Sequence, residues 1–306
     1  SIGTRNYTAI ILGNMGVAYD KIGDFDEALR HFERALKLAR DIPVKGSLAS
    51  IFANMGVVFE EMNKDSKALV KFKESLHAAR EVGNQEDEAA ALAAIGDIHA
   101  RKKQYSNALK YHNQALTLAK NIGQKNQEGR LYLNMGTVHL EKGDLPTALS
   151  FLEKALEVGT KMDAFDLIYE SLGDIATVEE KQRRYDDAIQ HYDQAIEKIE
   201  SVRERLRIES YKTKFMERKV SVYESIITLL IRLKRFEDAY EYLQRFRARS
   251  FLDILSPERI DITEGISPER FERYRFSEQK LRETYERLGN EYAKTVAKRD
   301  RRLVTA

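Results

Sequence analysis

The sequence predicts an all-α fold, an alpha-alpha superhelix built from antiparallel helical hairpins. Two observations lead to this prediction. Residue types recur at intervals of 40 residues, and within each interval apolar or small residues fall at helical spacing. The composition agrees with it, because four prolines, no tryptophan and 33% charged residues suit stacked helices better than a β-sandwich.

Two columns of the repeat hold small residues, and a third is mostly bulky. The first small column is Gly16, Gly56, Gly96, Gly136 and Ala176, and the second is Ala28, Ala68, Ala108, Ala148 and Ala188. The bulky column is Phe32, Phe72, His112, Leu152 and Tyr192. Two helices approach closely only where a side chain is small, so we expect glycine to face alanine across each hairpin, with larger residues at the flanks.

The first repeat shows how one unit divides into two helices. The stretch "YTAIILGNMGVAYDKIG" is broken at "GD", and "FDEALRHFERALKLAR" resumes the helical spacing. Gly23 can take the left-handed conformation that ends the first helix, and Asp24 can cap the second, with Glu27 three residues later. Where Asn63, Lys103 and Arg183 replace this glycine, we expect a slightly strained or differently built turn.

The period breaks after the fifth repeat, because Ala239 follows Ala188 by 51 residues instead of 40. Apolar spacing predicts one long helix from Tyr185 to Glu209 and another from about Tyr211 to Leu233. The sequence therefore predicts five hairpins over residues 1–200 and an extended sixth hairpin over 201–255. Residues 256–306 are predicted to be a loop and a charged helix that acts as a linker or cap.

These columns resemble the tetratricopeptide repeat over residues 7 to about 200. The small residue at its eighth position, an aromatic or bulky residue at its eleventh and alanine at its twentieth all match. The forty-residue unit resembles the lengthened variant in kinesin light chain and the Gα-anchoring spindle adaptors. The resemblance implies a protein-binding scaffold in which the first helices line a concave groove and the sixth position points into it.

The sixth-position column supplies the candidate peptide contacts. It holds Asn14, Asn54, Ala94, Asn134 and Asp174, and Arg130 lies one helical turn before Asn134. An asparagine amide can donate and accept, so a ladder of amides can pair with the backbone of an extended peptide; the alternative is a solvated helix face. Acidic groove positions, among them Glu60, Asp97, Glu141 and Glu180, favour a basic or neutral ligand over a C-terminal carboxylate.

The end of the sixth hairpin, "RFRARSFLDIL", resembles the last repeat before the caspase-related CHAT domain in bacterial proteins. The resemblance covers residues 200–255 and implies a sensing or regulatory arm of a larger, protease-like protein. Arg245, Arg247 and Arg249 are expected either to pack their stems against the loop at 256–267 or to contact acidic residues of that following domain.

Several functions are disfavoured by what the sequence lacks. There is no cysteine, no phosphate-binding loop and no nucleophile motif, and the six histidines are not at metal-ligand spacing. We therefore expect no cofactor, no metal and no enzymatic activity within these 306 residues. No apolar run of 18 residues and no leader is present, so we expect a cytoplasmic chain with no membrane contact. The opening "SIGTRNY" has no methionine, which suggests an excised fragment.

Charge is unevenly placed along the chain. Residues 1–197 carry a net charge of about −5 and residues 198–306 about +7. The basic third leaves nucleic-acid binding as an alternative function, although its basic residues alternate with acids at helical spacing, as on a solvated face.

Overall fold

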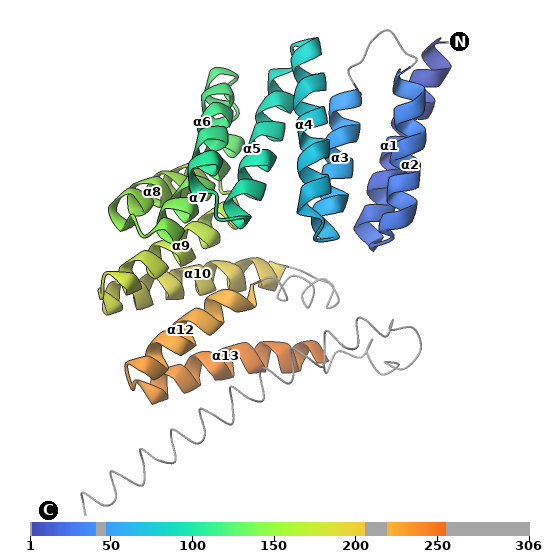
Figure 1. The fold of residues 1–306 in the computed structure, drawn as a ribbon. Coiled ribbons are helices and arrows are strands. Elements are labelled where there is room, and N and C mark those ends of the chain that lie inside the picture. The colour runs from blue at the N-terminus through green and yellow to red at the C-terminus, as the bar shows by residue number, and fades with distance from the viewer. Residues whose placement is uncertain (1, 41–46, 206–218, 255–306) are drawn as a thin grey trace, which may run out of the picture. The chain divides into compact units, whose positions relative to one another are not determined.

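The computed structural model describes residues 2–40, 47–205 and 219–254, and every regular element in these ranges is a helix (Figure 1). The helices are α1 (Ile2–Ile22), α2 (Phe25–Arg40), α3 (Leu48–Glu61), α4 (Asp65–Val82), α5 (Gln85–Arg101), α6 (Tyr105–Asn121), α7 (Lys125–Lys142), α8 (Leu145–Lys161), α9 (Phe165–Lys181), α10 (Tyr185–Arg205), α12 (Val220–Arg232) and α13 (Phe236–Ile254). The all-α prediction is confirmed.

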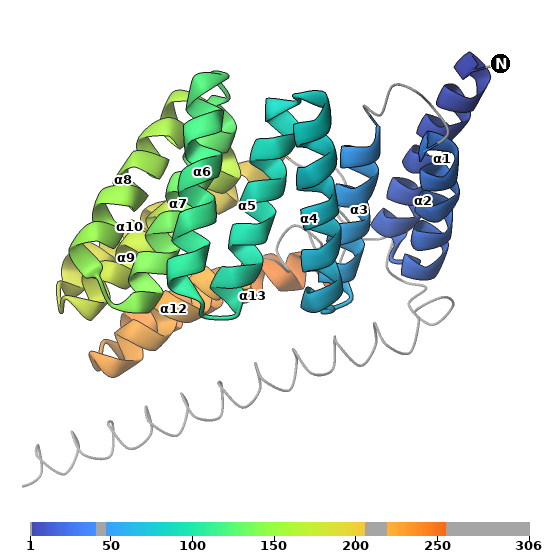
Figure 2. The same ribbon diagram turned by 45° about the horizontal axis from the view of Figure 1, so that its top comes forward.

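The chain divides into two compact units, residues 1–182 and residues 183–306. In the first unit, α1 pairs with α2, α3 with α4, α5 with α6 and α7 with α8, and the hairpins lie side by side (Figure 2). Each second helix also contacts the first helix of the next hairpin. Successive first helices touch as well, from α1 to α9, so they form a continuous layer along one side.

The small column accommodates the bulky column, which corrects the expected glycine–alanine contact. A Cβ added at Gly16 would lie 2.7 Å from the Phe32 ring, and one at Gly56 would lie 2.6 Å from the Phe72 ring. Gly96 and Gly136 meet His112 and Leu152 in the same way. Residues at equal distances from an antiparallel turn face one another, and Gly16 and Phe32 lie eight residues before and eight residues after Asp24. The alanine column, which lies nearer the turn, is fully buried.

The turns follow the predicted chemistry and explain how glycine is replaced. Gly23 has a φ of 84°, and Asp24 Oδ1 accepts a hydrogen bond of 3.2 Å from the Glu27 amide, as predicted. Asn63 and Lys103 adopt the same left-handed conformation, with φ of 57° and 56°. The turn is therefore built alike in each hairpin, and the non-glycine residues carry a modest backbone strain.

The second unit contains α10, α12 and α13, with α12 packed against both of the others. The long helix predicted from Tyr185 is described to Arg205, and the next predicted helix is described from Val220. Ile227, which stands in the glycine column, is buried. The rest of the inserted segment, residues 206–218, and the predicted loop and charged helix at 256–306 lie outside the described residues, and much of the basic third lies there too.

We expect Gly56→Ala to lower the free energy of unfolding by about 1–3 kcal/mol, because the new methyl group would overlap the Phe72 ring. Gly56→Leu should unfold this hairpin locally. Gly13→Ala is the matched control: it also lies in a first helix, but its Cβ meets no atom within 4 Å, so a gain of up to about 1 kcal/mol is expected. Urea unfolding followed by circular dichroism measures both, and equal midpoints for the two alanine variants would refute the packing role of Gly56.

Candidate functional site

A groove of about 700 Å³ lies on the first-helix side of the first unit, between α5, α7 and α9. The polar lining comes from Asp97 and Arg101 on α5 and from Arg130 and Asn134 on α7. Phe165 and Asp166 at the start of α9 line the other side. Ala93, Ala164 and Phe165 are half-buried and add apolar surface, and the buried Leu131 and Leu167 lie beneath it. A volume of this size falls in the range of ligand-binding clefts, and this groove is lined by more polar and charged residues than apolar ones.

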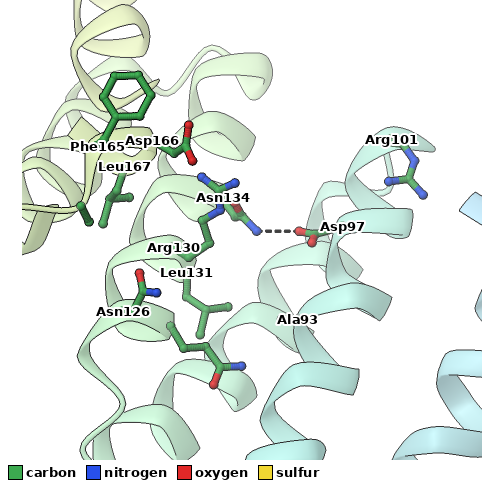
Figure 3. A pocket seen from close by; sticks show the side chains of 12 residues that line it. Ala93, Asp97, Arg101, Asn126, Arg130, Leu131, Asn134, Phe165, Asp166 and Leu167 are labelled. Carbon is green, nitrogen blue, oxygen red and sulfur yellow. Dashed lines mark hydrogen bonds between the residues drawn. The ribbon is translucent and has the colours of Figure 1, made fainter. Parts of the chain in front are cut away.

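Two side-chain hydrogen bonds join neighbouring repeats on this side of the molecule, each between residues 37 positions apart. Asn134 Nδ2 donates to Asp97 Oδ1 at 2.7 Å, as Figure 3 shows, and Thr137 Oγ1 donates to Asp174 Oδ2 at 2.6 Å. In each pair the sixth-position residue of one repeat bonds the ninth-position residue of the repeat before it. Asn134 and Asp174 were predicted as peptide contacts, and both side chains already form hydrogen bonds within the array.

The first two repeats lack these bonds because their ninth-position residues are apolar. Val17 and Val57 stand there and cannot bond an amide. Asn14 is exposed and Asn54 is half-buried. Contact of Asn14 and Asn54 with a peptide backbone stays a prediction. Unlike Asn134, these two asparagines form no such side-chain hydrogen bond to a neighbouring repeat among the described residues.

Both arginines that line the groove are paired with carboxylates. Arg130, which was predicted as a groove residue, lines it and bonds Glu170 on α9. Arg101 reaches Glu60 at 2.6 Å and Asp65 at 3.1 Å. Their positive charge is therefore largely neutralised by the protein itself.

Asp97 has a buried partner that sequence reasoning missed. His112 Nε2 on α6 lies 2.9 Å from Asp97 Oδ1, and His112 is 0% exposed. Sequence analysis placed the two residues in separate columns, one acidic and one bulky, and gave no contact between them. The sequence did hold a signal: Asp97 and His112 both differ in residue type from the rest of their columns, and both lie in the third repeat.

Burial raises the pKa of two carboxyl groups on the groove side. Desolvation raises the pKa of Glu60, and the paired Arg101 partly opposes this effect. Desolvation also raises the pKa of Asp174 to about 6, the hydrogen bond from Thr137 opposes the shift, and the charges of Glu170 and Glu141 add to it.

Three of the other histidines stack on aromatic rings, and His77 is exposed beside Glu81. His31 stacks on Tyr19, His99 on Tyr111 and His139 on Phe151. Within the described ranges no group of three or more histidine, cysteine, aspartate or glutamate side chains is placed to hold a metal ion.

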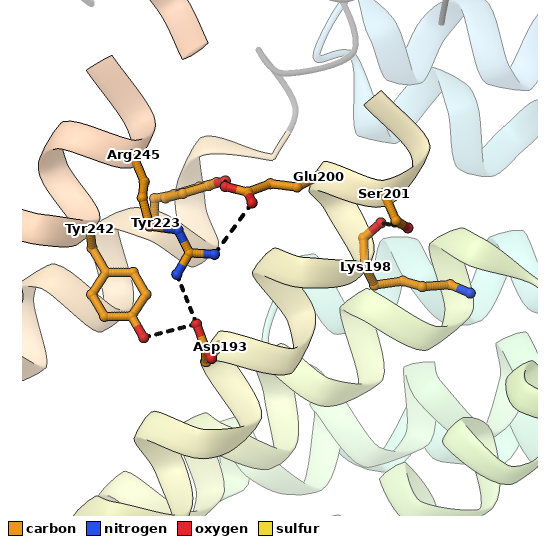
Figure 4. A network of polar contacts seen from close by, with 7 residues as sticks. All are labelled: Asp193, Lys198, Glu200, Ser201, Tyr223, Tyr242 and Arg245. Atoms are coloured by element: carbon orange, nitrogen blue, oxygen red, sulfur yellow. Dashed lines mark hydrogen bonds and ion pairs between the residues drawn. The ribbon is translucent and has the colours of Figure 1, made fainter. Parts of the chain in front are cut away.

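Arg245 contacts two acids of its own unit, a pairing that the sequence analysis did not predict, and the loop at 256–267 expected beside it lies outside the described residues. In the second unit its guanidinium lies 3.1 Å from Asp193 and 3.3 Å from Glu200, both on α10 (Figure 4). The Tyr242 hydroxyl also donates to Asp193, at 2.9 Å, and burial raises the pKa of Tyr242. Arg245 thus joins α13 to α10, because α10 is long enough to place two acids beside it. The side chains of Arg247 and Arg249 lie outside the described residues.

The fold and the groove define a solenoid of helical hairpins with a ligand-sized cleft on its first-helix side. Family models described as tetratricopeptide repeat match residues 7–81, 87–161 and 133–201. The chain belongs to the tetratricopeptide repeat family, as its columns predicted. A search of curated proteins finds no match.

Solved structures share this fold at low sequence identity. RapI in its apo form is 16% identical with a TM-score of 0.60, covering 84% of this chain and 99% of that one. A Rap protein complexed with competence and sporulation factor is 16% identical with a TM-score of 0.58, covering 92% and 76%. BtubC from P. vanneervenii is 17% identical with a TM-score of 0.57, covering 66% and 90%. Among the helices that the structure describes, none is long and apolar enough to cross a membrane.

Asp174→Asn tests the raised pKa of Asp174. Because this pKa is about 6 in the folded state and 3.8 for an unperturbed aspartate, the carboxyl stabilises the fold fully below pH 4, and the contribution is lost as pH rises toward 6. Asparagine is neutral and can still accept from Thr137. We expect equal stability of the variant and wild type near pH 4, and a variant that is up to about 2 kcal/mol more stable above pH 6.

Urea unfolding at pH 4, 5, 6 and 7.5 measures this difference. Glu153→Gln, an exposed change on α8, controls for the loss of one negative charge. A difference between Asp174→Asn and wild type that does not change with pH would contradict the prediction.

Proposed function

We propose that this chain is a protein-interaction scaffold that binds an extended peptide or protein segment in the groove between α5, α7 and α9. The observation that carries the proposal is the groove itself, about 700 Å³ in volume, lined by both polar and apolar side chains. One structural neighbour is a Rap protein complexed with competence and sporulation factor, which supports ligand binding by this fold.

The groove chemistry suits a segment in extended conformation. Asp97 and Asn134 present a carboxylate and an amide beside the half-buried Ala93 and Phe165, so backbone groups and apolar side chains of a ligand both find partners. Asn14 and Asn54 extend the polar column toward the first hairpin and are proposed to contact the same segment. Since the exposed arginine charges are already paired, a ligand with basic or neutral side chains fits better than an acidic one.

Filling the groove should abolish peptide binding. Asn126 is exposed and lines the groove, so Asn126→Trp places an indole inside it without breaking any of the ion pairs described above. Asn107→Trp adds the same ring to an exposed position on α6, outside the groove. Peptides enriched from a random display library on the wild-type chain should bind the Asn107 variant normally and lose at least about tenfold in affinity for the Asn126 variant.

Fluorescence anisotropy with the enriched peptides gives these affinities, and circular dichroism melting confirms that both variants fold. Peptides that bind all three proteins equally would place the binding surface elsewhere.

We further infer that the array is the sensing arm of a larger protein that carries a CHAT-type protease domain. The support is the resemblance of "RFRARSFLDIL", residues 245–255, to the last repeat before such domains. Sequencing the parent gene beyond the codon for Ala306 should reveal a histidine and a cysteine in a caspase-like pattern. A downstream sequence without them would overturn this inference and leave the scaffold proposal intact.

A further inference from the structure

The third repeat departs from the repeat pattern at two positions that meet in space. The ninth-position column is Val17, Val57, Asp97, Thr137 and Thr177, and the bulky column is Phe32, Phe72, His112, Leu152 and Tyr192. Only this repeat has a carboxylate in the ninth-position column together with an imidazole in the bulky column. Gly96 accommodates the His112 ring as Gly56 accommodates that of Phe72, so packing alone does not require an imidazole. Paired departures from a packing pattern are where function is expected.

The two departures fix one carboxylate at the groove. His112 Nε2 lies 2.9 Å and Asn134 Nδ2 2.7 Å from the same oxygen, Oδ1 of Asp97. A carboxylate can only accept, so His112 Nε2 carries the proton and donates it. His112 is fully buried, which fixes its ring, and the Asp97 side chain remains 41% exposed.

The second oxygen of this carboxylate is available to a ligand. Asp97 lines the groove, and no side chain of the described ranges donates a hydrogen bond to its Oδ2. The two arginines of the groove are held by Glu60, Asp65 and Glu170. The open charge in the groove is therefore negative, and a cationic donor is its electrostatic complement.

We propose that Asp97 Oδ2 binds a lysine or arginine side chain of the peptide held in the groove, and that His112 is the positioning residue that keeps this carboxylate in place. The proposal rests on the proposed peptide-binding function of the groove. The aliphatic stem of such a side chain can lie along the half-buried Ala93 and Phe165 while its charged end reaches Asp97. A free amino terminus offers the same ammonium chemistry, and the test separates the two sources.

Five fluorescent pools of synthetic heptapeptides serve as probes for the full chain. Four pools are blocked at both ends and fix the central residue as lysine, arginine, norleucine or glutamate, with mixed alanine, serine, leucine and valine elsewhere. The fifth is the norleucine pool with a free amino terminus. We expect the lysine and arginine pools to bind at least about fivefold more tightly than the blocked norleucine pool, and this preference to shrink as salt rises.

Two variants separate recognition from folding. Asp97→Asn keeps the shape of the side chain and removes its charge, and His112→Phe restores the ring found in the first two repeats. In Asp97→Asn the preference for lysine and arginine should vanish, while affinity for norleucine is unchanged. In His112→Phe the preference should fall by at least about threefold at unchanged norleucine affinity, a selective loss that a merely structural role of His112 would not produce.

Each result decides the proposal. A lysine preference that survives Asp97→Asn, or equal binding of all blocked pools, overturns it and leaves peptide binding by the groove in place. A preference that survives His112→Phe refutes the positioning role of His112. If the free-terminus pool binds as tightly as the lysine pool, the assignment to a side chain is overturned. If no pool binds and library selection also fails, the proposed function falls with the inference.

Discussion

The contact between a glycine on one helix and a bulky side chain on the next determines the geometry of each hairpin in the first unit. Phe32, Phe72, His112 and Leu152 each lie against a glycine whose own Cβ would overlap them. The two helices can therefore lie close together, because one bulky side chain instead of two fills the space between them. One hairpin alone leaves the opposite side of each helix apolar, so stability requires the next hairpin to cover it. The constant spacing of 16 residues between the glycine and the bulky residue in each hairpin follows from this contact.

Because apolar packing between neighbours holds the array together, the polar positions on the first helices can differ from repeat to repeat. In the first repeats this pairing does not form, because Asn54 has Val17 across the repeat boundary and Val57 has Ala94. From the third repeat onward the equivalent positions join Asn134 to Asp97 and Thr137 to Asp174. The first-helix layer is thus one surface with two kinds of chemistry, amides toward its start and a bonded acidic region toward its end.

The sequence was sufficient for the helices, the columns and the turns, because each depends on residues close together in the chain. Asp24, for example, caps a helix whose first turn it adjoins, and the lysine at 103 occupies a turn position marked by glycine elsewhere. The errors arose where contact depends on which equivalent residues meet. A period states that Asp97 and Asn134 occupy particular columns, but it does not state that a residue bonds another 37 positions later. The contact between Arg245 and Asp193 was missed for the same reason, since the two residues lie 52 positions apart in the chain.

The difference between Asp97 and Asp174 shows why one acid of the groove side suits a cationic ligand and the other does not. Asp174 is held by a single hydroxyl donor, and desolvation raises its pKa to about 6, so at lower pH it carries a proton instead of a charge. Asp97 instead receives two N–H donors on one oxygen and remains 41% exposed. A ligand cation reaching Asp97 need not enter a dry site, and the geometry of the acceptor is already fixed. Pre-organisation of this kind reduces the ordering that binding would otherwise require, so affinity is expected to concentrate at the third repeat.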